Sequence, residues 1–220
     1  MLIACWSAKG GAGTTVVATA LAVLLARARP RGAVLVDLAG DAPLALGLDG
    51  RPRSPGVADW LARAPDVPPD AVGRLLEVVE KDRLWLLRRG SGPLPPGGAD
   101  LLASVLAADD RPVVVDCGRI DGDSAAVASV LAAGATRSLL VVRPCFLALH
   151  RAAAVPLRPT GIVLVRDEGR IIGAADVEST LGAPVVARVR VTDQIARSVD
   201  AGLLRAHLPR TLATDLAHAA

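Results

Sequence analysis

Aromatic side chains are scarce in this chain. Its 220 residues include no tyrosine, one phenylalanine (Phe146) and three tryptophans. Proteins that hold single-stranded nucleic acid stack successive bases on aromatic side chains. The sequence offers no such platform, which argues against RNA-recognition and oligonucleotide-binding barrel folds.

Cysteine is also rare. Cys5, Cys117 and Cys145 are odd in number, lie far apart and form no CxxC pair. Neither a disulfide framework nor a zinc site is predicted, and we expect three small, buried apolar side chains. Cys145 follows a predicted strand, but a nucleophilic thiolate needs a base, and the only histidine near it in sequence is His150. A packed cysteine is the preferred interpretation.

Long hydrophobic runs are missing as well. The longest, Val16–Ala26, is shorter than the ~20 residues of a membrane-spanning helix, so it predicts a buried helix. No basic segment leads into an apolar one at the start, and we expect a cytoplasmic protein. Lysine is rare too: Lys9 and Lys81 stand among 25 basic residues, so Lys9 calls for an explanation.

Apolar residues, in contrast, are abundant. They make up 52% of the chain against 21% charged residues, which predicts a large core and excludes disorder. The length is typical of a single domain over residues 1–220. A net charge of +3 permits contact with nucleic acid without arguing for it. Arginines late in the chain could contact DNA nonspecifically, but a solvent-exposed basic face is the preferred interpretation of them.

Short β-branched runs alternate with Ala/Leu-rich helical segments. The predicted strands are Leu2–Trp6, Ala33–Val36, Leu84–Leu87, Pro112–Val115, Ser138–Val142, Gly161–Val165 and Pro184–Val189. The predicted helices are Thr15–Arg27, Ala58–Arg63, Asp70–Glu80, Ala99–Ala107, Asp123–Ala133, Phe146–Ala154, Ala174–Leu181 and Asp193–Ala201. Continuously apolar strands are typical of sheets buried on both faces. The sequence thus predicts a doubly wound α/β domain whose mostly parallel sheet has about seven strands and helices on both faces.

The stretch from Arg51 to Asp100 interrupts this alternation. Eight prolines mark its connections. We predict that residues 51–100 are a variable insertion within the single domain.

The first strand-to-helix turn has the composition of a phosphate-binding loop. It reads Ser7-Ala8-Lys9-Gly10-Gly11-Ala12-Gly13-Thr14-Thr15. Glycines let backbone N–H groups close around phosphate oxygens, and the start of the helix adds a partial positive charge. The Thr15 hydroxyl is a candidate ligand for Mg²⁺. The alternative is a glycine-rich turn that only connects strand to helix.

The string KGGAGTT resembles KGGxGK[ST], the deviant Walker A motif of the ParA/MinD group of P-loop ATPases. The resemblance implies the P-loop NTPase fold, ATP and Mg²⁺ as cofactors, and a homodimer that forms with nucleotide. It implies that phosphates are held by Lys9, Gly10, Gly11, Ala12, Gly13, Thr14 and Thr15. It also implies a catalytic role for Lys9, which would reach into the partner subunit's site.

The same string departs from the family motif at one position. The second family lysine, which contacts the β- and γ-phosphates, falls on the uncharged Thr14. Stabilising the charge of phosphoryl transfer would therefore lose a main contributor, and we expect slow or absent hydrolysis. The KGGxGTT variant resembles the TadZ/CpaE branch, which is associated with pilus assembly at the cell pole.

Two further segments resemble family motifs around catalytic aspartates. Val34–Asp49 resembles switch I, with Asp37 as its first aspartate; the second falls on Ala39, which cannot orient water, and Asp41 could replace it only if the loop rearranged. The alternative role of Asp37 is to cap a turn. Pro112–Gly118 resembles a Walker B strand, which implies that Asp116 either holds Mg²⁺ through water or positions switch II.

The resemblance covers almost the whole chain, with a further change at the base pocket. The family asparagine that reads adenine falls on Val165, so relaxed base selectivity is expected.

The tail Arg210–Ala220 lacks both the apolar bulk and the charge of a membrane-binding amphipathic helix, and direct membrane binding is not expected.

The implied function is a nucleotide-dependent dimerising switch or scaffold that positions a partner protein of the pilus, secretion or partition type, with weak or no ATP hydrolysis. The alternative is a pseudo-ATPase interaction module that binds no nucleotide. An ATP-dependent ligase fits least, since no acidic or histidine cluster suggests a substrate pocket.

Overall fold

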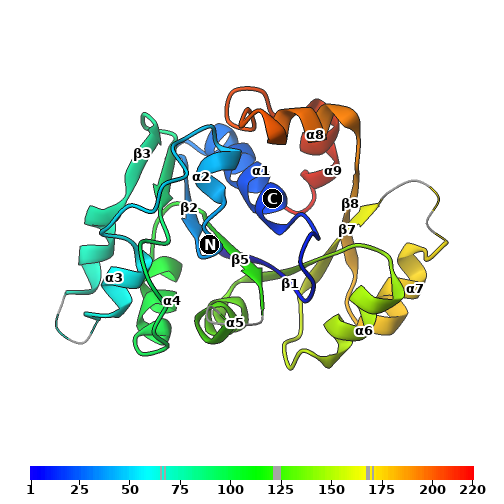
Figure 1. The fold of residues 1–220 in the computed structure, drawn as a ribbon, viewed down its shortest axis with the longest axis horizontal. Coiled ribbons are helices and arrows are strands. Elements are labelled where there is room, and N and C mark those ends of the chain that lie inside the picture. The colour runs from blue at the N-terminus through cyan, green and yellow to red at the C-terminus, as the bar shows by residue number, and fades with distance from the viewer. Residues whose placement is uncertain (65, 67, 121–124, 167–168, 170) are drawn as a thin grey trace.

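The computed structural model describes residues 1–64, 66, 68–120, 125–166, 169 and 171–220. They form an eight-stranded sheet in the order β3-β4-β2-β5-β1-β6-β7-β8 (Figure 1). Neighbouring strands are parallel, except that β3 and β4 are antiparallel at one edge. The strands are β1 (Leu2–Ser7), β2 (Ala33–Asp37), β3 (Glu77–Glu80), β4 (Leu84–Leu87), β5 (Val113–Arg119), β6 (Arg137–Val142), β7 (Gly161–Arg166) and β8 (Val185–Arg190).

Successive residues of the central strands face opposite sides of the sheet. In β1, Leu2, Ala4 and Trp6 pack into one core, while Ile3 and Cys5 pack into the other. All five are fully buried. Because both faces are covered, a polar residue on either side would lose contact with water, so the strand is apolar up to its last residue, Ser7.

Two layers of helices cover the sheet (Figure 1). One face carries α1 (Thr14–Ala28), α2 (Ala42–Ala45), α8 (Asp193–Asp200) and α9 (Arg210–Leu216). The other carries α3 (Val57–Leu61), the 3-10 helix η1 (Pro69–Leu75), α4 (Ala99–Ala107), α5 (Ala125–Gly134), α6 (Phe146–Ala154) and α7 (Ala174–Leu181). This architecture is the predicted doubly wound α/β fold.

The chain leaves the central strand β1 toward β2 on one side and later returns through β5 to build β6, β7 and β8 on the other. In such sheets, ligands bind beyond the carboxyl ends of the strands, where the winding direction changes. The turn after β1 occupies that position.

One predicted helix was wrong, and two observed helices were not predicted. The helix predicted over Asp70–Glu80 is instead η1 followed by β3, so the described sheet has eight strands rather than about seven. Glu77–Glu80 has polar ends and pairs along its length with β4, and this pairing outweighs local helix propensity. Helices α2 and α9 were not predicted. The first residues of the predicted helix Asp123–Ala133 lie outside the described residues.

The stretch 51–100 supplies α3, η1 and the strands β3 and β4 at one edge of the sheet. Whether it is a variable insertion stays a prediction. The three cysteines are free thiols: Cys5 and Cys117 are buried, as predicted, and Cys145 is partly buried.

Candidate functional site

The glycine-rich turn joins the end of β1 at Ser7 to the start of α1 at Thr14. Gly11 and Gly13 have positive φ angles of 74° and 93°, which other residues rarely adopt. A Cβ atom at either position would meet nothing within 4 Å. Backbone conformation, rather than crowding, therefore requires glycine here, and the outer side of the loop is open.

The start of α1 has the features of an anion-binding helix N-terminus. Gly13 is the N-cap residue and supplies no side-chain hydrogen bond, and the first turn contains no acidic residue. The first N–H groups of a helix have no partner inside it and carry the positive end of the helix dipole. Lys9 is half-buried in the same loop, and it forms no ion pair with any residue that the structure describes.

A pocket of about 190 Å³ lies between this loop and the turn after β6. Residues 8–12 line one side, and Val142, Arg143, Cys145 and Ala148 lie among those on the other. The structure thus places Arg143 and Cys145 beside the glycine-rich loop. His150 is exposed and stacks on Phe146, with 6.0 Å between ring centroids, so the structure gives no support for a Cys145–His150 pair.

Asp37 and Asp116 lie side by side at the ends of neighbouring strands. They are register partners of β2 and β5, and their exposed fractions are 1% and 0%. One oxygen of each accepts a backbone hydrogen bond: Gly40 N–H donates to Asp37 Oδ1 at 2.7 Å, and Gly118 N–H donates to Asp116 Oδ1 at 3.0 Å. Within the described chain, both Oδ2 atoms are buried without a hydrogen-bond partner.

This arrangement makes both carboxyls weaker acids than usual. Burial, reinforced by the charges of Asp116 and Asp41, raises the pKa of Asp37 to about 7. Burial also raises the pKa of Asp116 to about 6, although the Thr15 hydroxyl and the Gly118 N–H counteract it. A buried carboxylate needs a positive partner to stay charged. In its ionised form, the pair is therefore incomplete without a cation.

Mg²⁺ fits this incompleteness. It binds carboxylates and hydroxyls, commonly with one or two protein carboxylates and the remaining positions filled by phosphates and water. Asp116, Asp37 and the Thr15 hydroxyl are the residues that would hold it. Among described residues, no group of three or more His, Cys, Asp or Glu side chains is placed to hold a metal ion.

The two departures from the family pattern have visible consequences. Thr14 is 6% exposed, so an uncharged side chain is buried where a lysine would act. Ala39 packs against Gly118, since a Cβ built on Gly118 would lie 3.0 Å from the Ala39 Cβ. The exposed Asp41 precedes α2 as its N-cap residue, and its charge raises the pKa of both buried carboxyls, so it lies within electrostatic range of the site.

Arg119 is a site residue that sequence reasoning missed. Its Nη1 atom lies 3.7 Å from the position of a Cβ atom built on Gly10, so a guanidinium lies beside the glycine-rich loop. Arg119 is the last residue of β5, the strand that carries Asp116. A cation three residues after a Walker B-like aspartate was the available signal.

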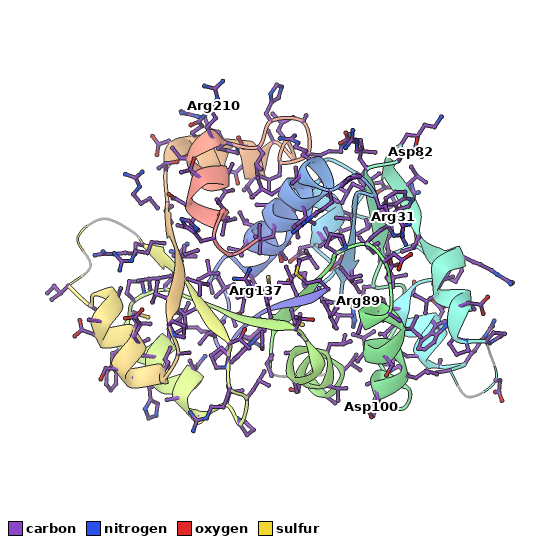
Figure 2. The ribbon with its side chains drawn as sticks, turned by 180° about the vertical axis from the view of Figure 1, so that it is seen from behind. Arg31, Asp82, Arg89, Asp100, Arg137 and Arg210 are labelled. Atoms are coloured by element: carbon purple, nitrogen blue, oxygen red, sulfur yellow. The ribbon has the colours of Figure 1, made fainter. Side chains whose placement is uncertain are left out.

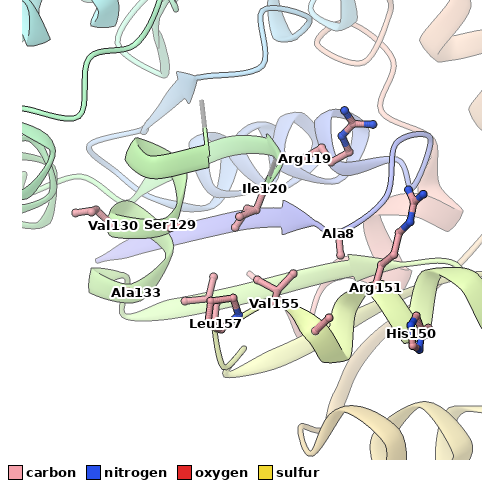
Figure 3. A pocket seen from close by; sticks show the side chains of 12 residues that line it. Ala8, Arg119, Ile120, Ser129, Val130, Ala133, His150, Arg151, Val155 and Leu157 are labelled. Atoms are coloured by element: carbon pink, nitrogen blue, oxygen red, sulfur yellow. The ribbon is translucent and has the colours of Figure 1, made fainter. Parts of the chain in front are cut away.

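A wider hollow of about 870 Å³ opens between α5 and α6. Figure 3 shows the apolar side chains of Ile120, Val155 and Leu157 facing this groove, with Arg119 and Arg151 toward the end near Ala8. Ala8 is the residue it shares with the pocket beside the glycine-rich loop. Although this groove is larger, residues 9–12 of the glycine-rich loop do not line it, so its size does not make it the candidate phosphate site.

Known structures share this architecture across nearly the whole chain. A ParA family ATPase from Chlorobium tepidum TLS matches with a TM-score of 0.76 at 18% identity, over 98% of this chain and 96% of that one. The septum site-determining protein MinD from Pyrococcus horikoshii OT3, solved with Mg-ADP, matches with a TM-score of 0.76 at 20% identity, over 97% and 91%. The ATP complex of a Cyanothece McdA variant matches with a TM-score of 0.67 at 15% identity, over 92% and 88%.

No protein-family model and no curated protein sequence matches the chain. The structural likeness shows that the chain has the fold of ParA/MinD P-loop ATPases. None of the described helices has both the length and the apolar character needed to cross a membrane.

Proposed function

We propose that this protein is a nucleotide-dependent positioning switch of the ParA/MinD type, which binds Mg-ATP and dimerises to recruit a partner. The observation that carries this proposal is the placement of the open glycine-rich loop and Lys9 at the centre of the sheet, beside two buried carboxyls whose Oδ2 atoms have no partner among described residues. The structures that share the fold, with MinD bound to Mg-ADP and McdA to ATP, support it.

In the bound state, one set of groups would contact the phosphates and another would hold the metal ion. Backbone N–H groups of residues 10–15 would donate to phosphate oxygens, and Lys9 and Arg119 would supply positive charge. Mg²⁺ would neutralise phosphate charge beside Asp116, Asp37 and Thr15. Bound cation would favour the ionised form of both carboxyls, because it supplies the missing opposite charge.

Hydrolysis in this site should be weak. Thr14 supplies no charge for the transferring phosphoryl group, and Ala39 can neither orient nor deprotonate water. The site would hold triphosphate for long periods, which suits a scaffold that stays assembled.

The finer assignment to a TadZ/CpaE-like branch rests on the KGGAGTT string alone. It would place the protein in pilus assembly or secretion, at the cell pole. Partition is the alternative setting for the same switch. A gene neighbourhood rich in pilus or secretion genes supports the first, and an adjacent centromere-binding partner supports the second.

Titration of a fluorescent ATP analogue with Mg²⁺ tests the proposal. Wild type should bind the analogue, and the Kd of Lys9→Ala should be at least about tenfold higher, since a charge-assisted contact is lost. Lys81→Ala is the matched control because it removes the chain's other, exposed lysine. Absence of saturable binding to wild type would overturn the switch.

A second candidate is an interaction module that keeps the fold and binds no nucleotide. The raised pKa of Asp37 and Asp116 favours it, because protonated carboxyls need no cation. This candidate predicts that ATP changes neither the thermal unfolding midpoint nor the mass of the protein in solution. A nucleotide-dependent change in either quantity would exclude it.

A further inference from the structure

A second pocket lies at the same edge of the sheet, beyond the ends of β2 and β4. It encloses about 290 Å³, and four of its lining residues are arginines: Arg51, Arg53, Arg88 and Arg89. The rest of the wall is formed by residues 37, 39, 40, 43, 50, 52 and 90–92. It shares no lining residue with the pocket beside Lys9.

Two arginines of the four have acidic partners. The Arg88 side chain is 7% exposed and forms an ion pair with Glu77. Its Nη1 also donates to the Asp49 carbonyl at 2.8 Å. The Arg53 guanidinium lies 3.8 Å from the carboxylates of both Glu77 and Asp49, so Glu77 interacts with Arg53 as well as with Arg88. These contacts occupy Arg88 and link β3, β4 and the loop at residue 49.

The other two arginines keep their charge available. Across the described residues, neither Arg51 nor Arg89 forms an ion pair. Arg89 Nη2 donates to the Gly92 carbonyl at 3.2 Å, whereas Arg89 Nη1 is buried and has no hydrogen-bond partner among those residues. A buried N–H of a charged group without an acceptor is costly, so this atom is available to an anionic ligand.

The pocket is held in shape by its backbone. Val57 N–H donates to the Arg88 carbonyl at 2.9 Å, and Ala58 N–H donates to the Arg89 carbonyl at 2.8 Å, so the start of α3 anchors the exit of β4. A Cβ atom on Gly56 would lie 2.5 Å from the Gly90 nitrogen, so these two segments touch. The Arg89 side chain in turn rests on Gly40, with its Cδ 3.7 Å from the position of a Cβ there (Figure 2 labels Arg89).

We propose that this arginine pocket, defined by Arg51, Arg89 and the loop 90–92, binds the phosphate group of a small phosphate ester. Two uncompensated guanidinium groups match the double charge of a phosphate ester near neutral pH, and guanidinium groups bind phosphate with paired hydrogen bonds. The volume is at the small end of ligand pockets. None of the residues that line it is aromatic, so a stacked base is not required.

Asp37 connects this pocket to the first site. It lines the arginine pocket, and its carboxyl lies beside Asp116 at the glycine-rich loop. The proposal does not depend on ATP binding.

Titration with inorganic phosphate, followed by two-dimensional ¹H–¹⁵N NMR of the full chain, tests it. The amide signals of Gly90, Ser91 and Gly92 should shift and saturate, separately from those of Gly11 and Gly13. Arg89→Gln should weaken this response at least about tenfold, since a charge-assisted hydrogen bond is lost. Arg51→Gln, at an exposed position, is the second variant if the first fails to fold, and Arg74→Gln is the matched exposed control.

The outcomes separate the alternatives. Loss of the response at residues 90–92 in Arg89→Gln or Arg51→Gln, with retention in Arg74→Gln and Lys9→Ala, supports the pocket. Tighter binding of a sugar phosphate than of inorganic phosphate supports an ester as ligand. Shifts confined to residues 9–15, or equal binding of a dicarboxylate such as succinate, would overturn the assignment.

Discussion

Thr14 and Ala39 are the two residues that set the chemistry of the site apart from the family motifs. Each replaces a charged side chain by a small uncharged one, and both are held in well-packed surroundings: Thr14 is buried, and Ala39 lies against Gly118. The surrounding groups, Lys9, Asp37, Asp116 and Thr15, match the resemblance in type. We therefore expect single substitutions to separate binding from hydrolysis.

Restoring the missing lysine should strengthen nucleotide binding. Thr14→Lys adds a cation where the resemblance places the β- and γ-phosphates, so the Kd for Mg-ATP should fall about tenfold. Thr14→Val, which keeps the shape without the charge, is the control. Fluorescence titration measures both, and an unchanged Kd in Thr14→Lys would mean that phosphates do not reach this position.

The buried carboxyl pair should make stability depend on pH in an unusual direction. The pKa of Asp37 is about 7 in the folded protein against an ordinary value of 3.8, so between these values the folded state binds more protons. Stability therefore falls as the pH rises through this window. Asp37→Asn should remove a penalty on the order of 4 kcal/mol at about pH 8, and less at about pH 5.

Urea unfolding at the two pH values, without Mg²⁺, measures this effect. Asp70→Asn serves as the control, because that side chain is exposed. A stabilisation by Asp37→Asn that does not grow with pH would show that Asp37 is ionised at neutral pH in the free protein.

Among the secondary-structure elements, β3 is held in place by charge as well as by its ladder to β4. Glu77, the first residue of β3, pairs with the buried Arg88, the residue that follows β4. The neighbouring Arg88 guanidinium holds the pKa of Glu77 below its usual value. The ion pair therefore stabilises the edge of the sheet above the ordinary pKa of Glu77 and is lost as the pH falls through its lowered value.

Glu77→Gln should destabilise the protein by roughly 2 to 4 kcal/mol at neutral pH, because it leaves the Arg88 guanidinium buried without an acidic partner. Glu80→Gln, at an exposed position of the same strand, is the control. Thermal or urea unfolding measures the difference. Equal effects of the two variants would show that the pair adds no net stability.

The C-terminal helix α9 is a core element, which its composition did not suggest. Leu212, Leu216 and the following Ala219 are fully buried in the core that α1 shares. Arg137 also donates to the carbonyls of His218 and Ala220, both at 3.0 Å, which ties the end of the chain to β6. The apolar residues of the tail are few, but its leucines face inward.

Leu216→Ala should therefore cost about 2 to 5 kcal/mol of stability, the range for truncating a buried leucine. The exposed Thr214→Ala on the same helix should change stability by well under about 1 kcal/mol. Urea unfolding compares them. A small effect of Leu216→Ala would show that α9 detaches easily from the core.

At the scale of the whole molecule, the proposed switch predicts a change of assembly with nucleotide. Light scattering should give the monomer mass of 22.5 kDa without nucleotide and twice that mass with Mg-ATP. Lys9→Ala should stay monomeric, whereas Lys81→Ala should behave as wild type. A mass that is the same with and without Mg-ATP would contradict nucleotide-driven dimerisation.

Local sequence patterns predicted much of the fold. The helices Ala99–Ala107, Phe146–Ala154 and Ala174–Leu181 and the strands β1 and β2 are observed within a residue or two of their predicted bounds. Those segments have strong apolar patterns and turn residues at their ends. The pattern failed at Asp70–Glu80, because an edge strand depends on its partner more than on its own residues.

By itself, the sequence determined the α/β alternation, the glycine-rich loop after the first strand and the candidate residues Lys9, Thr15, Asp37 and Asp116, since each rests on residues that are near neighbours in the chain. Only the tertiary structure decided that Asp37 and Asp116 share a register, that Arg119 stands beside Gly10 and that Arg51 and Arg89 line one pocket. Strand order and pairing join segments far apart in sequence, and burial and charge act through those distant neighbours.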